Sequence, residues 1–173
     1  MSGIARVARE QGMEVTGSDL RDSRYVQQLR DAGITVFIGQ TASNIPLDPP
    51  DVVVVSTAIL ENNHELVEAK SRAIEIWHRA KMLAALGVNH TTLAVAGTHG
   101  KTTTSSMLAS TLDTLGFDPT FLIGGIVRSY NSNAHCGRGD YYVVEAAESD
   151  KSFTYIDPAA ALVTHVEADH PDT

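Results

Sequence analysis

Residues 93 to 106, LAVAGTHGKTTTSS, combine an apolar run with a glycine-framed turn and a Gly-Lys-Thr triplet that opens a helical stretch. In such a turn the backbone N–H groups of Gly97 to Lys101 and the positive end of the following helix would face a polyphosphate. The Lys101 ammonium supplies a mobile positive charge, and the Thr102 hydroxyl can hold magnesium. These residues predict a site for a nucleoside triphosphate. The predicted contacts are Gly97, Thr98, His99, Gly100, Lys101, Thr102 and Thr103.

The turn departs from the strict phosphate-loop pattern G-x-x-x-x-G-K-[ST], because Val95 stands where the first glycine belongs. A helix start that carries a surface lysine is the alternative interpretation. The context favours the phosphate loop, since Leu93 to Ala96 is typical of a buried strand and Thr102 to Leu115 of a helix closed by Gly116.

Polar side chains stand at the carboxyl ends of two further predicted strands, 141–146 and 160–164. Ligands of parallel sheets sit beyond the carboxyl ends of the strands, so these side chains are expected to meet the phosphate loop. Glu145 beside Thr102 would hold magnesium, and His170 would complete the metal shell or orient the substrate. For Glu145, a charged strand end that caps a neighbour is the alternative. The predicted catalytic residues are Lys101, Glu145 and His170, and the predicted metal ligands are Thr102, Glu145 and His170.

Two other groups of reactive residues have simpler interpretations. His165, Asp169 and His170 are candidate zinc ligands, but clustered histidines and acids without cysteines are more often solvated. Cys136 lies in a polar, glycine-containing loop, which favours a surface thiol over a nucleophile.

Composition and charge exclude several classes of protein. The chain has 173 residues, a net charge of -8 and no dense basic run, which argues against nucleic acid or an anionic membrane as a partner. The single cysteine allows no internal disulfide and suits the cytoplasm, and the start MSGIARVARE lacks the apolar core of a signal peptide. No segment is apolar enough to span a bilayer. Oligomeric state is not encoded in these features.

Short apolar runs alternate with helical stretches, which is typical of parallel sheets with crossover helices. A new strand-helix-strand unit begins after the short linker Gly87 to His90, and this predicts a domain boundary there. The run Val52 to Val55 does not alternate, which predicts a central strand buried on both faces. The expected helices are 2–11, 25–32, 64–72 and 102–115, and the expected strands are 13–16, 34–38, 51–56, 73–77, 91–96, 120–123, 141–146 and 160–164.

Both ends of the chain have the pattern of interrupted domains. A nucleotide-type α/β domain normally opens with a strand and a glycine loop, whereas here Met1-Ser2-Gly3 is typical of the end of such a loop. The last residues directly follow a strand, where a helix is expected. The predicted α/β fold is an incomplete Rossmann-like domain at 1–88, lacking its first strand and glycine loop, followed by an incomplete P-loop parallel-sheet ATPase domain at 89–173.

Several segments resemble the Mur ligase family in their order and spacing. In the second half they are GTHGKTTTSSM, LIGGIVRSYNSNAH, YYVVEAAESDKSF and ALVTHVEADHPD, and in the first half MSGIA, TGSD, VVSTAI and HRAKML. The resemblance covers essentially the whole chain and is strongest to members that join L-alanine to the lactyl carboxylate of UDP-N-acetylmuramate. It implies an ATP-dependent ligase of peptidoglycan precursor synthesis that works through an acyl phosphate.

The resemblance also implies roles for individual residues. Lys101 would stabilise charge on the transferred phosphoryl group of ATP, Thr102 and Glu145 correspond to magnesium positions, and His170 corresponds to a histidine near the metal and the substrate. In the first domain, residues that could also be ordinary turn or cap residues match the region that holds the UDP-sugar. These residues are Ser2, Gly3, Ser18, Asp19, Thr57 and Ala58.

The sequence departs from the family pattern at four positions. Ala147 replaces an aspartate, His165 an asparagine, Lys81 a glutamate, and Pro171 a larger apolar residue. Loss of a carboxylate two residues from Glu145 would weaken the shell that orients a magnesium ligand. The family's opening glycine loop, the rest of its central domain and its C-terminal domain have no counterpart here, so the 173-residue chain alone is expected to be inactive.

Three alternatives remain open at this stage. The related murein tripeptide ligase shares the phosphate loop, although the stretch ESDKSFTYIDP favours the L-alanine enzyme. A nucleotide-binding fragment without catalysis fits the interrupted ends and Ala147. A dinucleotide-dependent oxidoreductase is weakly supported, because its fingerprint loop is absent and Asp19 alone does not make a ribose site.

Overall fold

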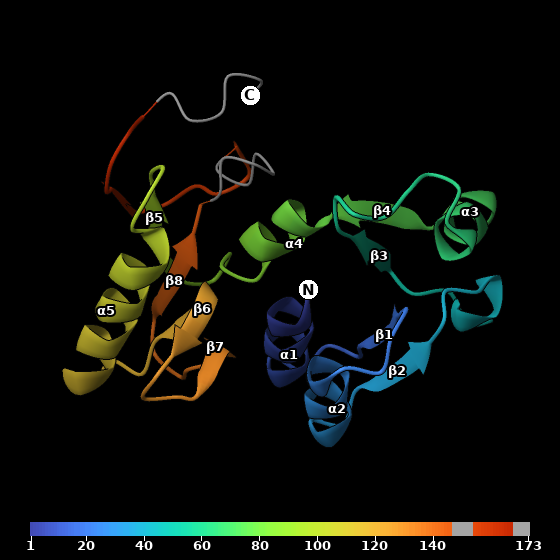
Figure 1. Ribbon diagram of the computed structural model, residues 1–173, viewed down its shortest axis with the longest axis horizontal. Helices are drawn as coiled ribbons and strands as arrows, with labels where there is room; N and C mark the ends of the chain where they lie inside the picture. Colours follow the sequence, from blue (N-terminus) through green and yellow to red (C-terminus); the bar gives the residue numbers. More distant parts are fainter. Residues whose placement is uncertain (147–153, 168–173) are drawn as a thin grey trace. The chain divides into compact units, whose positions relative to one another are not determined.

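The computed structural model describes residues 1–146 and 154–167. It divides the chain into two compact units, Met1–Met82 and Leu83–Thr173, and both contain parallel strands linked by helices (Figure 1), which confirms the α/β class. The units separate within helix α4 (Arg79–Ala85), whose existence the sequence analysis missed. The boundary between residues 88 and 89 stays a prediction. None of the described helices is long and apolar enough to cross a membrane.

The first unit alternates helices with short strands, and its helices have clear local signals. Helix α1 buries Ile4, Val7 and Ala8 on one face. The Ser23 side chain caps the next helix, and the Asn63 side chain caps the third by accepting two backbone N–H groups. The elements are α1 (Ser2–Glu10), β1 (Thr16–Asp19), α2 (Arg24–Asp31), β2 (Thr35–Ile38), η1 (Ala42–Asn44), β3 (Val52–Val55), α3 (His64–Ser71) and β4 (Glu75–His78).

The strands of the first unit form two separate parallel pairs, β1 with β2 and β3 with β4. The prediction of a strand at 13–16 is wrong, because the chain first pairs at Thr16, opposite Thr35. The prediction that Val52–Val55 is buried on both faces is also wrong. All four valines are half-buried, since among the described residues β3 pairs only with β4. A cavity of about 360 Å³ is lined by both β1 and β3.

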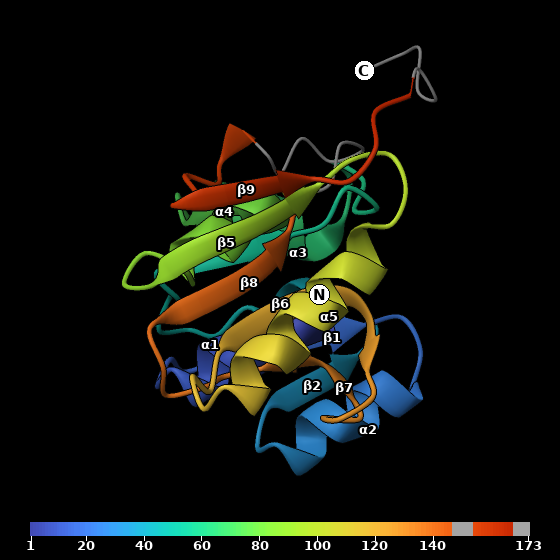
Figure 2. The same cartoon turned by 90° about the vertical axis from the view of Figure 1, so that its left-hand side faces the viewer.

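The second unit contains a five-stranded sheet in the order β7-β6-β8-β5-β9. Figure 2 shows β9, β5, β8 and β6 side by side, with α5 lying over the sheet. Only the β6–β7 pair of this sheet is antiparallel. The sequence analysis missed β7 and ended β6 four residues too early, because the Gly-Gly step inside β6 interrupts its apolar run. The elements are β5 (Thr91–Ala96), α5 (Lys101–Thr114), β6 (Thr120–Val127), β7 (Ser132–His135), β8 (Tyr141–Glu145) and β9 (Ala160–Val163).

The core of the second unit lies between α5 and the sheet. Ala109 and Leu112 from the helix pack with buried side chains of the strands, among them Phe121 and Val143. Tyr142 is fully buried, and its hydroxyl donates to the carbonyl of Leu83 at 2.9 Å, so the burial of a polar group is compensated. Burial raises the pKa of Tyr142 above its ordinary value. The core therefore fixes the strands whose ends carry the candidate site.

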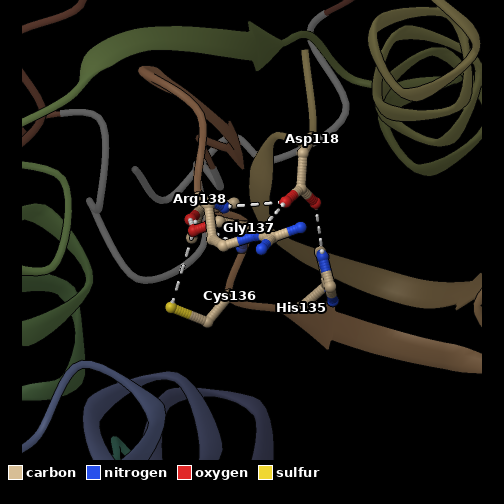
Figure 3. A network of polar contacts seen from close by, with 6 residues as sticks. Asp118, His135, Cys136, Gly137 and Arg138 are labelled. Carbon is tan, nitrogen blue, oxygen red and sulfur yellow. Dashed lines mark hydrogen bonds and ion pairs between the residues drawn. The ribbon is translucent and has the colours of Figure 1, made fainter. Parts of the chain in front are cut away.

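A polar clasp, made of Asp118, His135 and Arg138, closes the loop that precedes β8 (Figure 3). One Asp118 carboxylate oxygen accepts the backbone N–H of Arg138 at 3.0 Å, and the other lies 3.1 Å from His135 Nε2. The Arg138 N–H and then the His135 side chain hold the pKa of Asp118 below its usual value. The clasp thus connects the start of β6 with the loop before β8.

We expect Asp118→Asn to lower the free energy of unfolding by about 1 kcal/mol at neutral pH, a value reduced for the solvent exposure of the clasp. Because folding lowers the pKa of Asp118, its carboxylate contributes stability above its unfolded pKa of about 4, and this is lost as pH falls through the lower folded pKa. Denaturant titrations across that range measure the difference. Asp140→Asn, an exposed aspartate nearby, is the control. Equal stabilities of wild type and Asp118→Asn at neutral pH would contradict the role of the clasp.

Candidate functional site

The candidate site lies where three parallel strands end. Strand β5 pairs in parallel with β8 on one side and with β9 on the other, so their carboxyl ends share one edge of the sheet. The phosphate loop follows β5, Glu145 ends β8, and Thr164 follows β9. Parallel pairing therefore brings together side chains that are far apart in the sequence.

The phosphate loop has the backbone shape that its glycines permit. Gly97 has φ of 121° and Gly100 has φ of 84°, both in the left-handed region that other residues avoid. Helix α5 begins at Lys101, so the first N–H groups of the helix have no acceptor within it and carry its positive dipole end. The Lys101 ammonium donates to the carbonyls of Gly97 and Thr98. The loop thus gathers positive electrostatic potential at one point.

The segment after β9 runs along the loop and uses part of its hydrogen-bonding capacity. The Thr98 N–H donates to the His165 carbonyl at 2.7 Å, and the Thr98 hydroxyl accepts the Glu167 N–H at 3.0 Å. The amide of Thr98 therefore holds the loop in place rather than facing a ligand. The roles of the other predicted loop residues in nucleotide binding stay predictions.

Glu145 and Thr102 border one small space beside the loop. A Cβ atom built on Gly124 would lie 2.9 Å from Glu145 Oε2 and 3.5 Å from Thr102 Oγ1. The other carboxylate oxygen, Glu145 Oε1, is buried and has no hydrogen-bond partner among the described residues. A buried, unpaired carboxylate oxygen is costly unless a cation compensates it. Carboxylate and hydroxyl oxygens are ligands that magnesium prefers, so these residues fit that ion.

Two histidines and a glutamate gather at the outer side of the loop. Glu167 lies 2.8 Å from His165 Nε2 and 3.9 Å from His99 Nε2, and the two imidazole rings stack with centroids 6.3 Å apart. All three side chains are largely exposed. Within residues 1–146 and 154–167, no group of three or more His, Cys, Asp or Glu side chains has the arrangement of a metal site.

Some predicted residues lie outside the described residues. These include His170, with its predicted catalytic and metal-binding roles, and Asp169, the second candidate zinc ligand. The departures at Ala147 and Pro171 lie outside them as well. The roles assigned to these positions therefore stay predictions.

Reasoning from the sequence missed the residues that shape the space around Thr102. Besides Gly124, Gly125 is needed there, because a Cβ atom at that position would lie 2.6 Å from Thr102 Cγ2. The two consecutive glycines in the apolar stretch of β6 could have indicated this, since glycine within a strand often marks the close approach of another group. Thr164 was expected near the loop with the other polar side chains at this strand end, but no local signal indicated that its hydroxyl contacts the loop.

In the first unit, the cavity gathers only part of the predicted substrate contacts. Ser2, Ser18 and Asp19 line it. The Ser18 hydroxyl donates to Glu65 Oε2 at 2.7 Å, and Asp19 Oδ1 accepts the Arg21 N–H at 3.0 Å. Glu65 lines the same cavity and was missed by the sequence analysis. Of the described residues that were predicted to contact the sugar nucleotide, those that do not line this cavity are Gly3, Thr57 and Ala58.

Two family models match this chain. The model described as "Mur ligase family, catalytic domain" matches residues 1–91, and the "Mur ligase middle domain" model matches residues 95–173. The chain belongs to the Mur ligase family. Its phosphate loop, Glu145 and the end of β9 all fall in the match to the middle domain, and the cavity of the first unit falls in the other match.

Individual Mur ligases are similar to this chain over nearly its whole length. The UDP-N-acetylmuramate–L-alanine ligase of Carboxydothermus hydrogenoformans is 48% identical over 172 residues, which cover 99% of this chain and 37% of that protein. Among solved structures, the UDP-N-acetylmuramate-alanine ligase MurC of Thermotoga maritima is 32% identical with a TM-score of 0.86, covering 98% of this chain and 40% of that one. The UDP-N-acetylmuramate:L-alanyl-gamma-D-glutamyl-meso-diaminopimelate ligase of Neisseria meningitides has the same identity and TM-score, covering 99% and 59%. The chain thus spans little more than a third of the curated relative.

We expect Gly124→Ala to weaken magnesium-dependent nucleotide binding about tenfold, because the added Cβ atom displaces Glu145 or Thr102. A fluorescent ATP analogue titrated with magnesium and with EDTA measures the effect, which should be confined to the magnesium titration. Gly17→Ala is the matched control, since no atom lies within 4 Å of the added Cβ atom there. Unchanged magnesium dependence in Gly124→Ala would contradict the assignment of this space to the metal.

Proposed function

We propose that this chain forms sugar-nucleotide-binding and ATP-binding parts of a Mur ligase that joins L-alanine to the lactyl carboxylate of UDP-N-acetylmuramate, releasing ADP and phosphate. The observation that carries the proposal is the meeting of the phosphate loop, Thr102 and a buried Glu145 oxygen that has no hydrogen-bond partner in residues 1–146 and 154–167. The 48% identical relative of Carboxydothermus hydrogenoformans, named as an L-alanine ligase, supports this choice of amino acid. The solved structure from Neisseria meningitides, which is 32% identical to this chain, supports murein tripeptide as a second candidate substrate in place of L-alanine.

The phosphate loop would act by positioning and by neutralising charge, which dominate catalysis of phosphoryl transfer. A lactyl carboxylate oxygen attacks the γ-phosphorus of ATP, and the bond to the ADP oxygen breaks. The alanine nitrogen then attacks the acyl carbon, loses a proton, and expels phosphate. Lys101 would exchange its bonds to the Gly97 and Thr98 carbonyls for phosphate oxygens, while the first N–H groups of α5 orient the triphosphate.

Thr102 and Glu145 would hold magnesium, with His170 as a further ligand or a contact to the substrate. The ion supplies charge neutralisation for the triphosphate oxygens. The Glu145 carboxylate is suited to this role, because one of its oxygens is buried without a protein partner among the described residues.

The cavity of the first unit would hold the UDP-sugar. Ser2, Ser18 and Asp19 line it, and carboxylate and hydroxyl groups can bond the polar groups of a nucleotide sugar. Gly3 would contribute from the first turn of α1, and Thr57 and Ala58 from the turn after β3. Glu65 would act on the ligand indirectly, because it orients the Ser18 hydroxyl.

We further propose that the protein works in the cytoplasm on these small molecules, with no nucleic-acid or membrane partner. The single cysteine and the net charge of -8 support this proposal. Its proposed substrates, ATP and a UDP-sugar, are charged metabolites that do not require a membrane site.

The test uses the full-length product of the gene that encodes this chain. Phosphate release from ATP is measured with UDP-N-acetylmuramate and L-alanine, together and separately. The expected result is release only when both are present. Release with murein tripeptide in place of L-alanine would support the second candidate, and nucleotide binding without release under any combination would support a fragment without catalysis.

We expect Lys101→Ala to lower kcat in that assay by about a hundredfold or more, because the transferred phosphoryl group loses the positive charge of the Lys101 ammonium. Lys70→Ala, which changes a lysine in the last turn of α3, is the charge-matched control and should leave the rate unchanged. Normal turnover by Lys101→Ala would refute the phosphate-loop mechanism.

A further inference from the structure

The phosphate loop is a segment whose shape needs external support. Its two glycines adopt left-handed backbone angles, and glycine has more conformational freedom than any other residue. A loop that binds a triphosphate through backbone N–H groups gains affinity when those groups are held in place beforehand. The contacts that hold this loop are therefore part of the binding site even where they touch no ligand.

The segment Thr164 to Glu167, directly after β9, supports the loop from outside it. Its backbone extends the β5–β9 ladder along the loop: Thr164 N–H donates to Ala96 at 3.0 Å, and the His165 carbonyl accepts the Thr98 N–H at 2.7 Å. The Glu167 N–H then donates to the Thr98 hydroxyl at 3.0 Å. These bonds connect residues more than 60 positions apart, so the loop depends on the correct register of β9.

The Thr164 side chain adds a contact that the ladder does not provide. Its hydroxyl oxygen lies 2.5 Å from the His99 carbonyl oxygen and 3.1 Å from the Ala96 carbonyl oxygen, and its single proton is donated to one of them or shared between both. The same hydroxyl fills the space above Gly97, where an added Cβ atom would overlap it. Thr164 atoms also lie within 3.7 to 3.9 Å of a Cβ position on Gly100. One side chain therefore contacts His99 and lies next to Gly97 and Gly100.

We infer that Thr164 is a positioning residue for the phosphate loop, holding its backbone in the shape that receives the triphosphate. This inference rests on the proposed nucleotide-binding function. The contact to His99 is specific to the hydroxyl, whereas the sheet itself is held by backbone bonds of β9. Loss of the hydroxyl should therefore affect the loop more than the stability of the sheet.

The experiment compares Thr164→Val, which keeps the side-chain shape but removes the hydroxyl, with Thr164→Ser, which keeps the hydroxyl. Binding of ATP and of inorganic tripolyphosphate to the 173-residue chain is measured by calorimetry, with a thermal melt of each variant. Thr164→Val should bind both ligands about three- to tenfold more weakly, as expected for one lost hydrogen bond, with nearly unchanged melting. Thr164→Ser should restore the affinity for both. If the binding of ATP and the binding of tripolyphosphate weaken equally, the effect belongs to the phosphate loop.

Thr91→Val makes the same chemical change in an exposed threonine at the opposite end of β5 and should bind like wild type. Wild-type affinity in Thr164→Val, or weak binding in Thr164→Ser equal to that of Thr164→Val, would overturn the inference. Failure of the wild-type chain to bind either ligand would instead count against the proposed function.

A measurement on the wild-type chain covers the case in which Thr164→Val does not fold. Hydrogen exchange of the Thr98 and Glu167 amides, which lie in the contact between the loop and this segment, is followed with and without tripolyphosphate. Exchange should slow at both amides when the ligand binds. Unchanged exchange at Glu167 in the presence of bound ligand would overturn the inference.

Discussion

The parallel pairing of β5 with both β8 and β9 is the constraint on which the candidate site depends. It sets Val95 opposite Glu145 on one side and opposite Leu162 on the other, so the loop after β5 begins level with the ends of its neighbours. A shift of one residue in either ladder would turn every side chain of that strand to the other face of the sheet. The buried side chains of β5 and β8 prevent this, and the packing that stabilises the sheet thereby also positions Glu145 beside the loop.

The candidate site contains locally unfavourable features that a stable core avoids. Gly97 and Gly100 hold left-handed backbone angles, and Glu145 keeps a buried oxygen without a partner in the described part of the chain. The Lys101 ammonium bonds to carbonyls of its own loop. Such features cost stability and persist where the surrounding structure determines them strongly, which is typical of functional sites. Here that surrounding structure is the sheet on one side and the segment from Thr164 on the other.

The first unit is held together differently. Its two parallel pairs are separate, and the valines of β3 are only half-buried, although parallel strands are normally covered on both faces. Side-chain hydrogen bonds compensate in part. The Glu65 carboxylate accepts from Ser18 in β1 and from Asn44 in η1, and so connects a strand, a short helix and α3 beside the cavity. The polar lining of the candidate sugar-nucleotide site and the cohesion of this unit therefore share the same residues.

The sequence by itself determined the features that rest on local signals. The bounds of β5 were predicted correctly and α5 to within one residue, because an apolar run, two glycines and a helical period lie within one short stretch. The proximity of Glu145 to Thr102, both of which lie within 4 Å of a Cβ position on Gly124, followed from the general geometry of parallel strands. Only the tertiary structure decided that Gly124 makes room for these two side chains, and that Thr164 supports His99 from 65 residues away. Contacts of this kind depend on which strands become neighbours, and that choice follows from packing across the whole sheet rather than from any local pattern.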